Sequence, residues 1–352
     1  MKWYQSDAGV QVVVCVLCCC RLAGYDVRFT LLNLLWLLDV DNMIVLVISF
    51  PGGGKTTYVQ TYIDQGYHRV NRDELGGKLY DLPKVVEELH KKGTVNFVLD
   101  NTYVDIEARK SIIECAKKLK LPIKCVWLNT SFEDAQFNAV QRMVRKAGRL
   151  LDPTDFKTNK DPNLFPPVAL FNYKEKFQKP TIAEGFDSVE VVEFVRKKDP
   201  KYKNKALFLD FDDNLRTVTQ GDFPYPTKVS EVKILPGRKE KLDEYVKKGY
   251  RLLGASNQSG IAKGNLTVQD AVDCFEETNR QLGHNIEYFF CPHSVPPVSC
   301  YCRKPSVGIF VYFIERYFLD TEQCVFVGDQ TSDKTAAARC KIKYYHPDEF
   351  FK

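Results

Sequence analysis

Short apolar runs alternate with helical stretches along the chain from Met43 onward. The apolar runs are rich in β-branched residues, and each is followed by a segment of helical character. The apolar runs are 44–48, 95–99 and 123–128, and the helical stretches are 55–65, 83–92 and 105–119. Strands and helices in alternation predict a parallel sheet covered by helices on both faces.

A charged segment, "RKKDPKYKNK" at 196–205, interrupts this order, after which the alternation restarts. The later strands are predicted at "ALFLDF", "YRLLGAS", "IEYFFC" and "CVFVGD", with helices near 236–248, 267–282, 305–318 and 332–339. A chain of 352 residues that is 44% hydrophobic is long enough for two cores. We therefore predict an α/β protein of two domains, 43–198 and 199–352, joined by 196–205 as a hinge.

The first 42 residues differ from the rest. Apolar runs at 10–20 and 29–38 are separated by charged residues before either reaches the roughly 18 residues that a membrane span requires. We expect an extension of unknown role at 1–42 that is not a membrane anchor. Met43 opens a complete predicted strand, so the extension is expected to be dispensable for activity or to reflect a misassigned start.

Charge and cysteine content narrow the class of protein only slightly. The net charge of +5 is mild and permits a nucleic-acid partner without requiring one. The chain has twelve cysteines, and three of them are adjacent, at 18–20, which favours free thiols in a reducing compartment. We expect an intracellular protein, nuclear or cytoplasmic, with no membrane partner; the oligomeric state stays open.

A glycine-rich stretch, "SFPGGGKT" at 49–56, follows the first predicted strand. In such a loop backbone N–H groups surround phosphate oxygens, the lysine reaches the β- and γ-phosphates, and the hydroxyl of Thr56 holds Mg²⁺. The full pattern has glycine where this chain has Ser49. The predicted ATP-binding residues of the loop are Pro51, Gly52, Gly53, Gly54, Lys55, Thr56 and Thr57.

Three further stretches extend this site. They are "GYHRVNRDELG" (66–76), "VLDNTYVDIEAR" (98–109) and "LFNYKEKFQKPTIAEGFDSV" (170–189). Together they resemble the 5′-hydroxyl kinase domain of polynucleotide kinase-phosphatases over about residues 43–195. The resemblance implies that Asp73 is the general base on the acceptor hydroxyl, with Asp100 near the metal and Arg109 near the phosphates.

Three arginines lie at i, i+3 and i+7 in "FNAVQRMVRKAGR". Arg142, Arg145 and Arg149 therefore share one helical face. They are predicted to form a lid that neutralises charge on the transferred phosphoryl group, with Arg142 as the best candidate. A solvated basic face explains the same spacing.

Aspartates gather in "DFDDN", directly after an apolar strand. This motif resembles the first motif of haloacid-dehalogenase-type (HAD-like) phosphatases, which have a Rossmannoid fold. The resemblance makes Asp210 the nucleophile and Asp212 the proton donor and acceptor, with Mg²⁺ shielding the charge. The later motifs of this phosphatase family follow in order along the chain. They add Ser256 and Lys304 as catalytic residues. The implied magnesium ligands are Asp210, Asp212, Asp329 and Asp333. The chain departs from the family at Asp213 and Asn214.

Cysteine and histidine bunch in "CPHSVPPVSCYCRKP" (291–305). Three thiolates and an imidazole suit a closed tetrahedral zinc site with a structural role, which would pin the loop that presents Lys304. The predicted ligands are Cys291, His293, Cys300 and Cys302. Four reduced, unliganded side chains are the alternative. This loop resembles the histidinol-phosphatase and heptose-bisphosphate-phosphatase branch, whereas "HPDEFF" (346–351) resembles polynucleotide 3′-phosphatases.

These resemblances together predict a bifunctional end-repair enzyme, a 5′-hydroxyl kinase and 3′-phosphatase, that uses ATP, Mg²⁺ and structural Zn²⁺. Its partners would be nucleic acid with 5′-hydroxyl or 3′-phosphate ends, and a ligase could act next. One alternative is a small-molecule kinase fused to a sugar-phosphate or histidinol-phosphate-like phosphatase, and another is a catalytically weak end-binding protein. We expect kinase activity to survive loss of the predicted zinc site at 291–302, because that site belongs to the other predicted domain.

Overall fold

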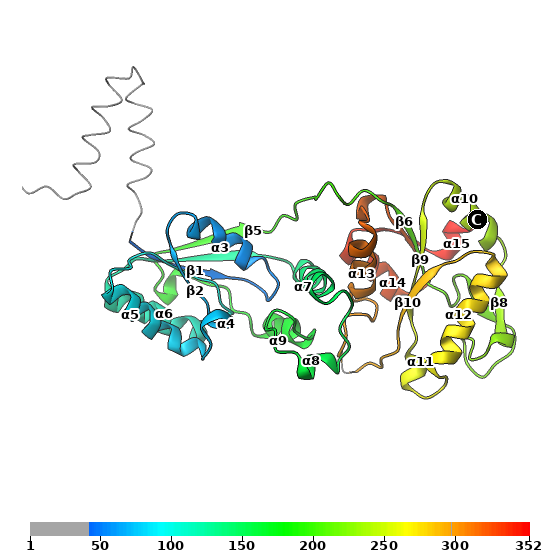
Figure 1. Cartoon of the computed structure of the whole chain (residues 1–352), viewed down its shortest axis with the longest axis horizontal. Helices are drawn as coiled ribbons and strands as arrows, with labels where there is room; N and C mark the ends of the chain where they lie inside the picture. The colour runs from blue at the N-terminus through cyan, green and yellow to red at the C-terminus, as the bar shows by residue number, and fades with distance from the viewer. Residues whose placement is uncertain (1–41, 297) are drawn as a thin grey trace, which may run out of the picture.

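The computed structural model describes residues 42–296 and 298–352. Figure 1 shows two α/β lobes side by side along the long axis of the molecule. We call residues 42–193 the first lobe and residues 206–352 the second lobe. The predicted extension at 1–42 lies outside the described residues except for its last position. No helix of the described part is long and apolar enough to cross a membrane.

The first lobe is built on a five-stranded parallel sheet with the strand order β2-β3-β1-β4-β5. Its central strand β1 has the sequence IVLVI and is buried along its whole length, as expected for a strand covered on both faces. The strands are β1 (Ile44–Ile48), β2 (His68–Val70), β3 (Phe97–Leu99), β4 (Ile123–Asn129) and β5 (Ser188–Glu193). The helices are α3 (Lys55–Ile63), α4 (Arg72–Leu75), α5 (Leu82–Lys91), α6 (Ile106–Leu119), α7 (Phe132–Ala147), α8 (Asp155–Thr158) and α9 (Val168–Lys176).

The second lobe repeats this architecture with the order β10-β9-β6-β11-β12, again all parallel. A small antiparallel hairpin of β7 (Arg216–Val218) and β8 (Val232–Ile234) lies beside the main sheet. The main strands are β6 (Ala206–Leu209), β9 (Arg251–Asn257), β10 (Glu287–Cys291), β11 (Val325–Val327) and β12 (Lys343–Tyr345). The helices are α10 (Arg238–Lys247), α11 (Ser259–Ala262), α12 (Val268–Leu282), α13 (Gly308–Tyr317), α14 (Thr331–Cys340) and α15 (Pro347–Phe350).

The two lobes pack through α7 and α13. Phe137 and Met143 of α7 belong to the same buried hydrophobic cluster as Phe310 and Ile314 of α13. Arg145 adds an ion pair across the junction, with Nε 2.7 Å from a carboxylate oxygen of Glu315. The lobes therefore share one continuous apolar core at their junction.

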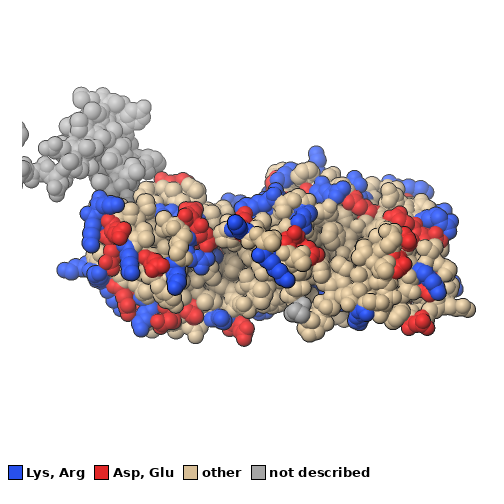
Figure 2. Space-filling model, turned by 60° about the horizontal axis from the view of Figure 1, so that its bottom comes forward, with Lys and Arg blue, Asp and Glu red and all other residues tan. Residues whose placement is uncertain are grey.

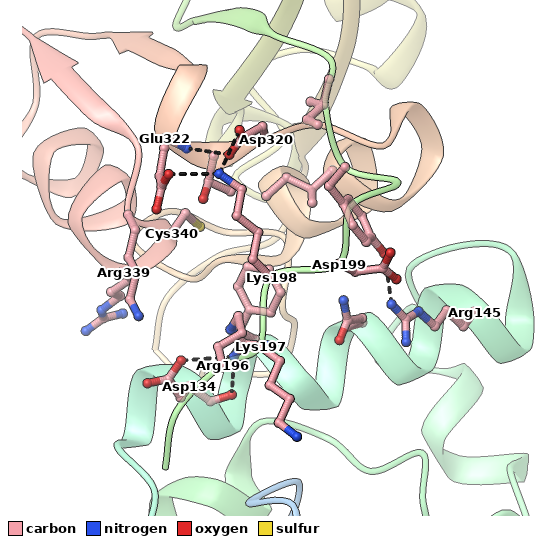
Figure 3. A pocket seen from close by; sticks show the side chains of 17 residues that line it. Asp134, Arg145, Arg196, Lys197, Lys198, Asp199, Asp320, Glu322, Arg339 and Cys340 are labelled. Atoms are coloured by element: carbon pink, nitrogen blue, oxygen red, sulfur yellow. Dashed lines mark hydrogen bonds and ion pairs between the residues drawn. The ribbon is translucent and has the colours of Figure 1, made fainter. Parts of the chain in front are cut away.

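The charged segment 196–205 is anchored on both sides, as Figure 3 shows for its first residues. Arg196 pairs with Asp134 of α7 at 2.9 Å, and Lys198 pairs with Asp320 of the second lobe at 3.0 Å. These residues line a junction cavity of about 370 Å³. The segment therefore contacts both lobes through ion pairs, and its role as a hinge stays a prediction.

The predicted α/β class and the parallel sheets are confirmed. The predicted strands that were found are the apolar ones, and they include every central strand and the edge strand β10. The strands absent from the sequence prediction are short or of mixed polarity, namely β2, β5, β7, β8 and β12.

Candidate active sites

The first candidate site is a cavity of about 550 Å³ at the carboxyl end of the first sheet. The glycine-rich loop after β1 forms one wall, and residues that follow β2 and β3 form the opposite wall. The predicted residues that line it are Pro51, Gly52, Gly53, Gly54, Lys55, Thr56, Asp73, Asp100 and Arg142. Thr57, on the first turn of α3, is not among the lining residues.

The loop conformation depends on its glycines. Gly52 has a φ of 75°, and a Cβ atom there would lie 2.8 Å from the carbonyl oxygen of Ala135. Lys55 Nζ donates to the carbonyl oxygens of Ser49, at 3.1 Å, and Phe50, at 2.9 Å. Burial lowers the pKa of Lys55 to about 8. The loop thus holds the buried ammonium group of Lys55. A bound phosphate would offset the free-energy cost of burying that charge.

Ser49 fits the position where the loop pattern has glycine. Its hydroxyl is buried and donates to the carbonyl oxygen of Leu128, 3.0 Å away on β4. Ser49 is not among the residues that line the cavity, but its side chain lies behind Gly53, which does line it. The serine therefore supports the loop from the side of the sheet.

Three carboxylates, those of Asp73, Glu74 and Asp100, lie on the wall opposite the loop, and two of them were predicted. Asp100 is buried and accepts hydrogen bonds from Arg69, at 2.8 and 3.0 Å, and from Asn71 at 2.9 Å. Asp73 lies in the first turn of α4, is exposed, and pairs with Arg72 at 2.7 Å. Asp100 is therefore held in one orientation, whereas Asp73 is free to meet an incoming group.

Only one of the three predicted lid arginines lines the cavity. Arg142 and Arg145 lie on α7, whereas Arg149 lies beyond its C-cap Gly148, so the three do not share one helical face as predicted. Arg142 lines the cavity, and its Nη1 donates to Asn163 Oδ1 at 3.0 Å. Burial lowers the pKa of Arg142, which marks a guanidinium without a full set of acidic partners. Arg145 and Arg149 do not line the cavity, because Glu315 and Asp155 hold them elsewhere.

The structure corrects the predicted position of Arg109. Its side chain is fully buried away from the cavity, and its guanidinium pairs with Glu184 at 2.6 and 3.0 Å. It also donates to the carbonyl oxygen of Tyr103 at 3.2 Å. This pair ties α6 to the 3-10 helix Ile182–Glu184, so Arg109 stabilises the lobe and does not contact phosphates.

Residues that orient Asp100 were absent from the sequence prediction. Arg69 and Asn71 lie at the end of β2, on either side of a buried Val70. Their position in "HRVNRD", the stretch that also contains Asp73, could have indicated that they lie near the site.

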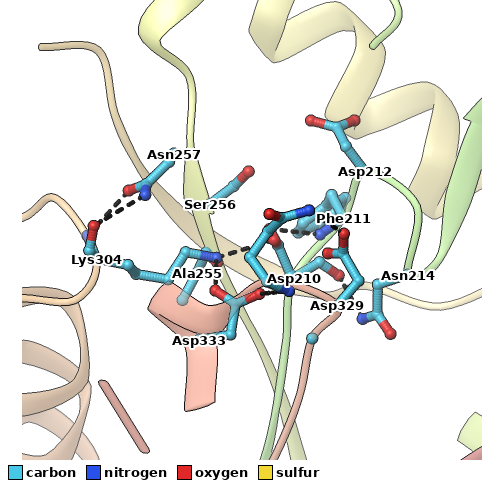
Figure 4. A network of polar contacts seen from close by, with 12 residues as sticks. Asp210, Phe211, Asp212, Asn214, Ala255, Ser256, Asn257, Lys304, Asp329 and Asp333 are labelled. Atoms are coloured by element: carbon cyan, nitrogen blue, oxygen red, sulfur yellow. Dashed lines mark hydrogen bonds and ion pairs between the residues drawn. The ribbon is translucent and has the colours of Figure 1, made fainter. Parts of the chain in front are cut away.

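The second candidate site lies at the carboxyl ends of β6, β9 and β11, in a cavity of about 180 Å³. Carboxylate oxygens of Asp210, Asp329 and Asp333 lie within 4.8 Å of one another. Lys304 Nζ lies 3.0 Å from Asp210 and 2.8 Å from Asp333, and it donates to the carbonyl oxygen of Ala255 at 2.7 Å. Figure 4 shows the side chains of Asp210, Asp329, Asp333 and Lys304 meeting at the ends of the strands, with Asp333 coming from α14 and Lys304 from a turn.

These three carboxylates have the chemistry of a divalent-cation site. Burial raises the pKa of Asp210 to about 7, despite the opposing effect of Lys304. One carboxylate oxygen of Asp329 is buried without a hydrogen-bond partner among the described residues. Closely spaced carboxylate oxygens of this kind fit Mg²⁺, which prefers hard oxygen ligands.

Asp212 does not join this carboxylate group. Its two oxygens accept from Arg216 Nε and from Gln258 Nε2, each at 2.8 Å. Figure 4 shows its side chain directed away from Asp210 and Asp333. The predicted role of its carboxylate as a magnesium ligand is therefore corrected, because these two donors hold it elsewhere; a proton-transfer role stays a prediction.

Neighbouring polar residues fix the geometry around Asp212. Gln258 also donates to the hydroxyl of Ser256 at 3.1 Å, which links the predicted phosphate-binding serine to Asp212. Asn214 Nδ2 donates to the carbonyl oxygens of Asp210, at 2.8 Å, and Val327, at 3.1 Å. Asn214 thus makes two hydrogen bonds that join the loop after β6 to the end of β11. Arg216 and Gln258 were absent from the sequence prediction, since nothing local marks them.

A third polar group consists of Cys291, His293, Cys300 and Cys302, which we call the metal loop. The sulfur atoms of Cys291 and Cys300 lie 3.6 Å apart, and His293 Nδ1 lies 3.4 Å from the sulfur atoms of Cys291 and Cys302. All four cysteine and histidine ligand atoms lie within 4.8 Å of one another, and the cysteines are free. Tetrahedral zinc with bonds of about 2.3 Å separates its sulfur ligands by about 3.8 Å. The group therefore has the composition and spacing of a metal site.

Known families match both halves of the chain. The family described as "Polynucleotide kinase 3 phosphatase" matches residues 205–351, and the family described as "AAA domain" matches residues 44–157. A bifunctional polynucleotide phosphatase/kinase of Schizosaccharomyces pombe is 37% identical over 157 residues, which cover 44% of this chain and 35% of that protein. The second half of the chain therefore matches a polynucleotide 3′-phosphatase family model, and the first half matches an AAA-domain model. The chain spans about a third of that relative's length.

Other similar proteins match either the second half or most of the chain. A probable D-glycero-D-manno-heptose-1,7-bisphosphate 7-phosphatase of Thermoplasma volcanium is 32% identical over 145 residues, which cover 40% of this chain and 96% of that protein. A solved structure, "Structure of the Pnkp1/Rnl/Hen1 RNA repair complex", aligns with 86% of this chain and 95% of that chain at 16% identity and a TM-score of 0.30. The heptose-bisphosphate phosphatases thus share the predicted phosphatase domain.

Proposed function

We propose that this chain is a polynucleotide kinase-phosphatase that repairs nucleic-acid ends. The first lobe would transfer the γ-phosphoryl group of ATP to a 5′-hydroxyl, and the second would remove a 3′-phosphate. The observation that carries the proposal is the presence of a glycine-loop cavity and a carboxylate–lysine cavity on one chain with these two family matches. Our proposed domain division remains 43–198 and 199–352.

In the first lobe the reaction would be an in-line phosphoryl transfer. The ATP phosphates would lie against the backbone of Gly52–Thr56 with Lys55 beside them, while Thr56 and Asp100 hold Mg²⁺ directly or through water. Asp73 would accept the proton as the 5′-oxygen attacks the γ-phosphorus and ADP leaves. Arg142, on the same cavity wall as Asn163, would stabilise the charge on the phosphoryl oxygens.

In the second lobe Asp210 would attack the phosphorus of the 3′-phosphate. Asp212 would give a proton to the leaving 3′-oxygen and then take one from the water that hydrolyses the aspartyl phosphate. Ser256 and Lys304 would bind the phosphate oxygens. Asp210, Asp329 and Asp333 would hold Mg²⁺, which shields the repulsion between a carboxylate and a phosphate.

The metal loop would bind Zn²⁺ in a structural role. Three sulfurs and one imidazole complete a tetrahedron and leave no position for water. The last ligand, Cys302, stands two residues before Lys304, so the ion would fix the loop that carries this lysine. Metal analysis of protein purified without added zinc should find about one zinc per chain.

The partner would be a polynucleotide whose ends are made ready for a ligase. Figure 2 shows lysine and arginine side chains near the junction of the lobes, and 196–205 carries six basic residues. A basic surface of this kind favours a polyanion.

One assay tests the whole proposal. The purified chain would be given ATP and Mg²⁺ on a nicked duplex with 5′-hydroxyl and 3′-phosphate ends, and both ends would be analysed. We expect a 5′-phosphate and a 3′-hydroxyl. A protein that leaves both ends unchanged, although it is folded and binds ATP, would contradict the proposal and favour the end-binding alternative.

A second candidate function follows from the heptose-bisphosphate phosphatase relatives, which the chain matches over 96% of one protein's length. In this alternative the second lobe hydrolyses a sugar phosphate and the first phosphorylates a small molecule. A panel of 3′-phosphorylated oligonucleotides and sugar phosphates separates the two functions by kcat/KM.

A further inference from the structure

The wall of the ATP cavity nearest the second lobe is a segment with little regular structure. Residues 150–167 connect α7 to α9, and their only helix is the four-residue α8. Pro162, Asn163 and Phe165 of this segment line the cavity. With so little regular structure of its own, the segment depends on the surface beneath it for its position.

That surface is formed by both lobes. Leu151, Phe156, Leu164 and Phe165 pack on a hydrophobic cluster that contains residues of α7 and α9 together with Cys291, Cys300, Tyr301 and Cys302. The metal loop therefore forms part of the apolar surface on which the cavity wall rests.

Tyr301 makes the most direct contact between the metal loop and the cavity wall. It stands between two metal-loop cysteines, is 1% exposed, and donates its hydroxyl to the carbonyl oxygen of Phe165 at 3.1 Å. Its ring meets that of Phe156 edge-on, with centroids 6.4 Å apart. A displacement of either neighbouring cysteine would move this hydroxyl.

His293 makes a second contact, at the other end of the segment. Its Nδ1 faces the sulfurs of the metal loop, and its Nε2 lies 3.2 Å from Oδ2 of Asp152. A metal-ligating histidine typically donates its other ring N–H to a carboxylate, which fixes the ring. Here the carboxylate belongs to the first lobe, so both ends of the segment are tied to the metal loop.

The segment in turn holds Arg142. Asn163 accepts a hydrogen bond from the guanidinium at 3.0 Å, and Asn163 and Phe165 line the same cavity. The contacts thus run from the metal loop through Tyr301 and Phe165 to the group that faces the ATP phosphates.

We propose that metal bound in the second lobe positions one wall of the ATP cavity in the first lobe, with Tyr301 and Asp152 as the positioning residues. This inference rests on the proposed kinase function and on metal occupancy of the loop. It reverses the expectation that the kinase is independent of the metal loop.

Metal removal from the full chain is the primary test. Zinc-loaded and chelator-treated protein would be compared by hydrogen exchange of 150–167 and by the Kd for ATP. We expect faster exchange in this segment and a rise in Kd of about fivefold to tenfold, both reversed by one equivalent of Zn²⁺. Exchange in α5 and α6, at the end of the first lobe away from the second lobe (Figure 1), should stay unchanged.

Tyr301→Phe tests the path without touching a ligand. It should keep about one metal per chain and yet raise the KM for ATP about threefold, with little change in kcat. Tyr288→Phe is the matched control, because it removes a tyrosine hydrogen bond to Glu276 within the second lobe. The control should leave KM unchanged.

The outcomes separate this inference from the proposed function. A metal-free chain with unchanged exchange at 150–167 and unchanged ATP affinity would overturn the inference alone, as would a wild-type chain that binds no metal. A loaded chain that binds no ATP would refute the proposed kinase, and the exchange measurement would still decide whether the metal positions the segment.

Discussion

The two candidate sites differ in size and in the arrangement of their charged groups. The first is a cavity of about 550 Å³ whose wall includes glycines, three carboxylates and an arginine from α7. The second is about 180 Å³, with buried carboxylates gathered around one lysine. The larger site has room for a nucleotide and an acceptor together, whereas the smaller one admits little more than a phosphate and its immediate neighbours. Volume and charge therefore distinguish the proposed transfer site from the proposed hydrolytic site.

The largest expected effect is on the smaller site. Asp210→Asn removes the proposed nucleophile but keeps the shape of the side chain, so phosphate release should fall at least about a thousandfold. Transfer of phosphate to a 5′-hydroxyl should stay within about twofold of wild type. Both activities would be measured on one nicked substrate, and loss of both in a folded protein would show that the sites are not independent.

The reciprocal variant tests the larger site. Lys55→Ala removes the cation beside the loop carbonyls, and 5′-phosphorylation should fall by about a hundredfold to a thousandfold. Phosphate release should be unaffected. A kinase rate within a factor of three of wild type would mean that Lys55 does not contact the phosphates.

A matched pair on α7 sharpens the assignment of the cavity wall. Arg142→Ala should lower kinase kcat by about a hundredfold, because its guanidinium lines the cavity. Arg145→Ala should change kcat by less than about threefold and mainly weaken the contact with Glu315 at the lobe junction. Equal losses of kcat in the two variants would favour a general basic face.

The buried ion pair of Arg109 and Glu184 is expected to affect the stability of the first lobe and not ATP binding. Arg109→Leu leaves a buried carboxylate without its partner, so the first lobe should lose about 3–5 kcal/mol of unfolding free energy. Arg109→Leu with Glu184→Leu should recover part of that loss. If stability is unchanged while the KM for ATP rises steeply, a phosphate-binding role for Arg109 would be restored.

The smallest effect is expected at Asn214. Asn214→Thr brings in the residue usual in this phosphatase family, and phosphate release should change by less than about tenfold, because a threonine hydroxyl can replace one of two hydrogen bonds. Asn214→Ala, which removes both, should cost more. A large gain with threonine would instead identify Asn214 as the residue that slows this chain.

The sequence was informative where function depends on a strand end. The glycine loop, Asp100, Asp210 and Asp329 each follow an apolar strand, and parallel strands bring their carboxyl ends to one edge. The short strand β12 could not be recognised, because its polar and apolar residues do not form a clear pattern.

Side-chain direction was the part that could not be predicted. Arg109 turns into the core because Glu184, distant in sequence, meets it there. Asp212 turns away from the carboxylate group because Arg216 and Gln258 each donate to it. In both cases the deciding partner lies on another element, so local spacing carried no information about it.

The apolar core shared by α7 and α13 constrains how the molecule comes apart. Cutting the chain between 198 and 199 would leave each half with an uncovered hydrophobic face at Met143 or Phe310. Such halves would aggregate when made alone, yet they should assemble into a stable heterodimer when made together, with the old junction as its subunit interface.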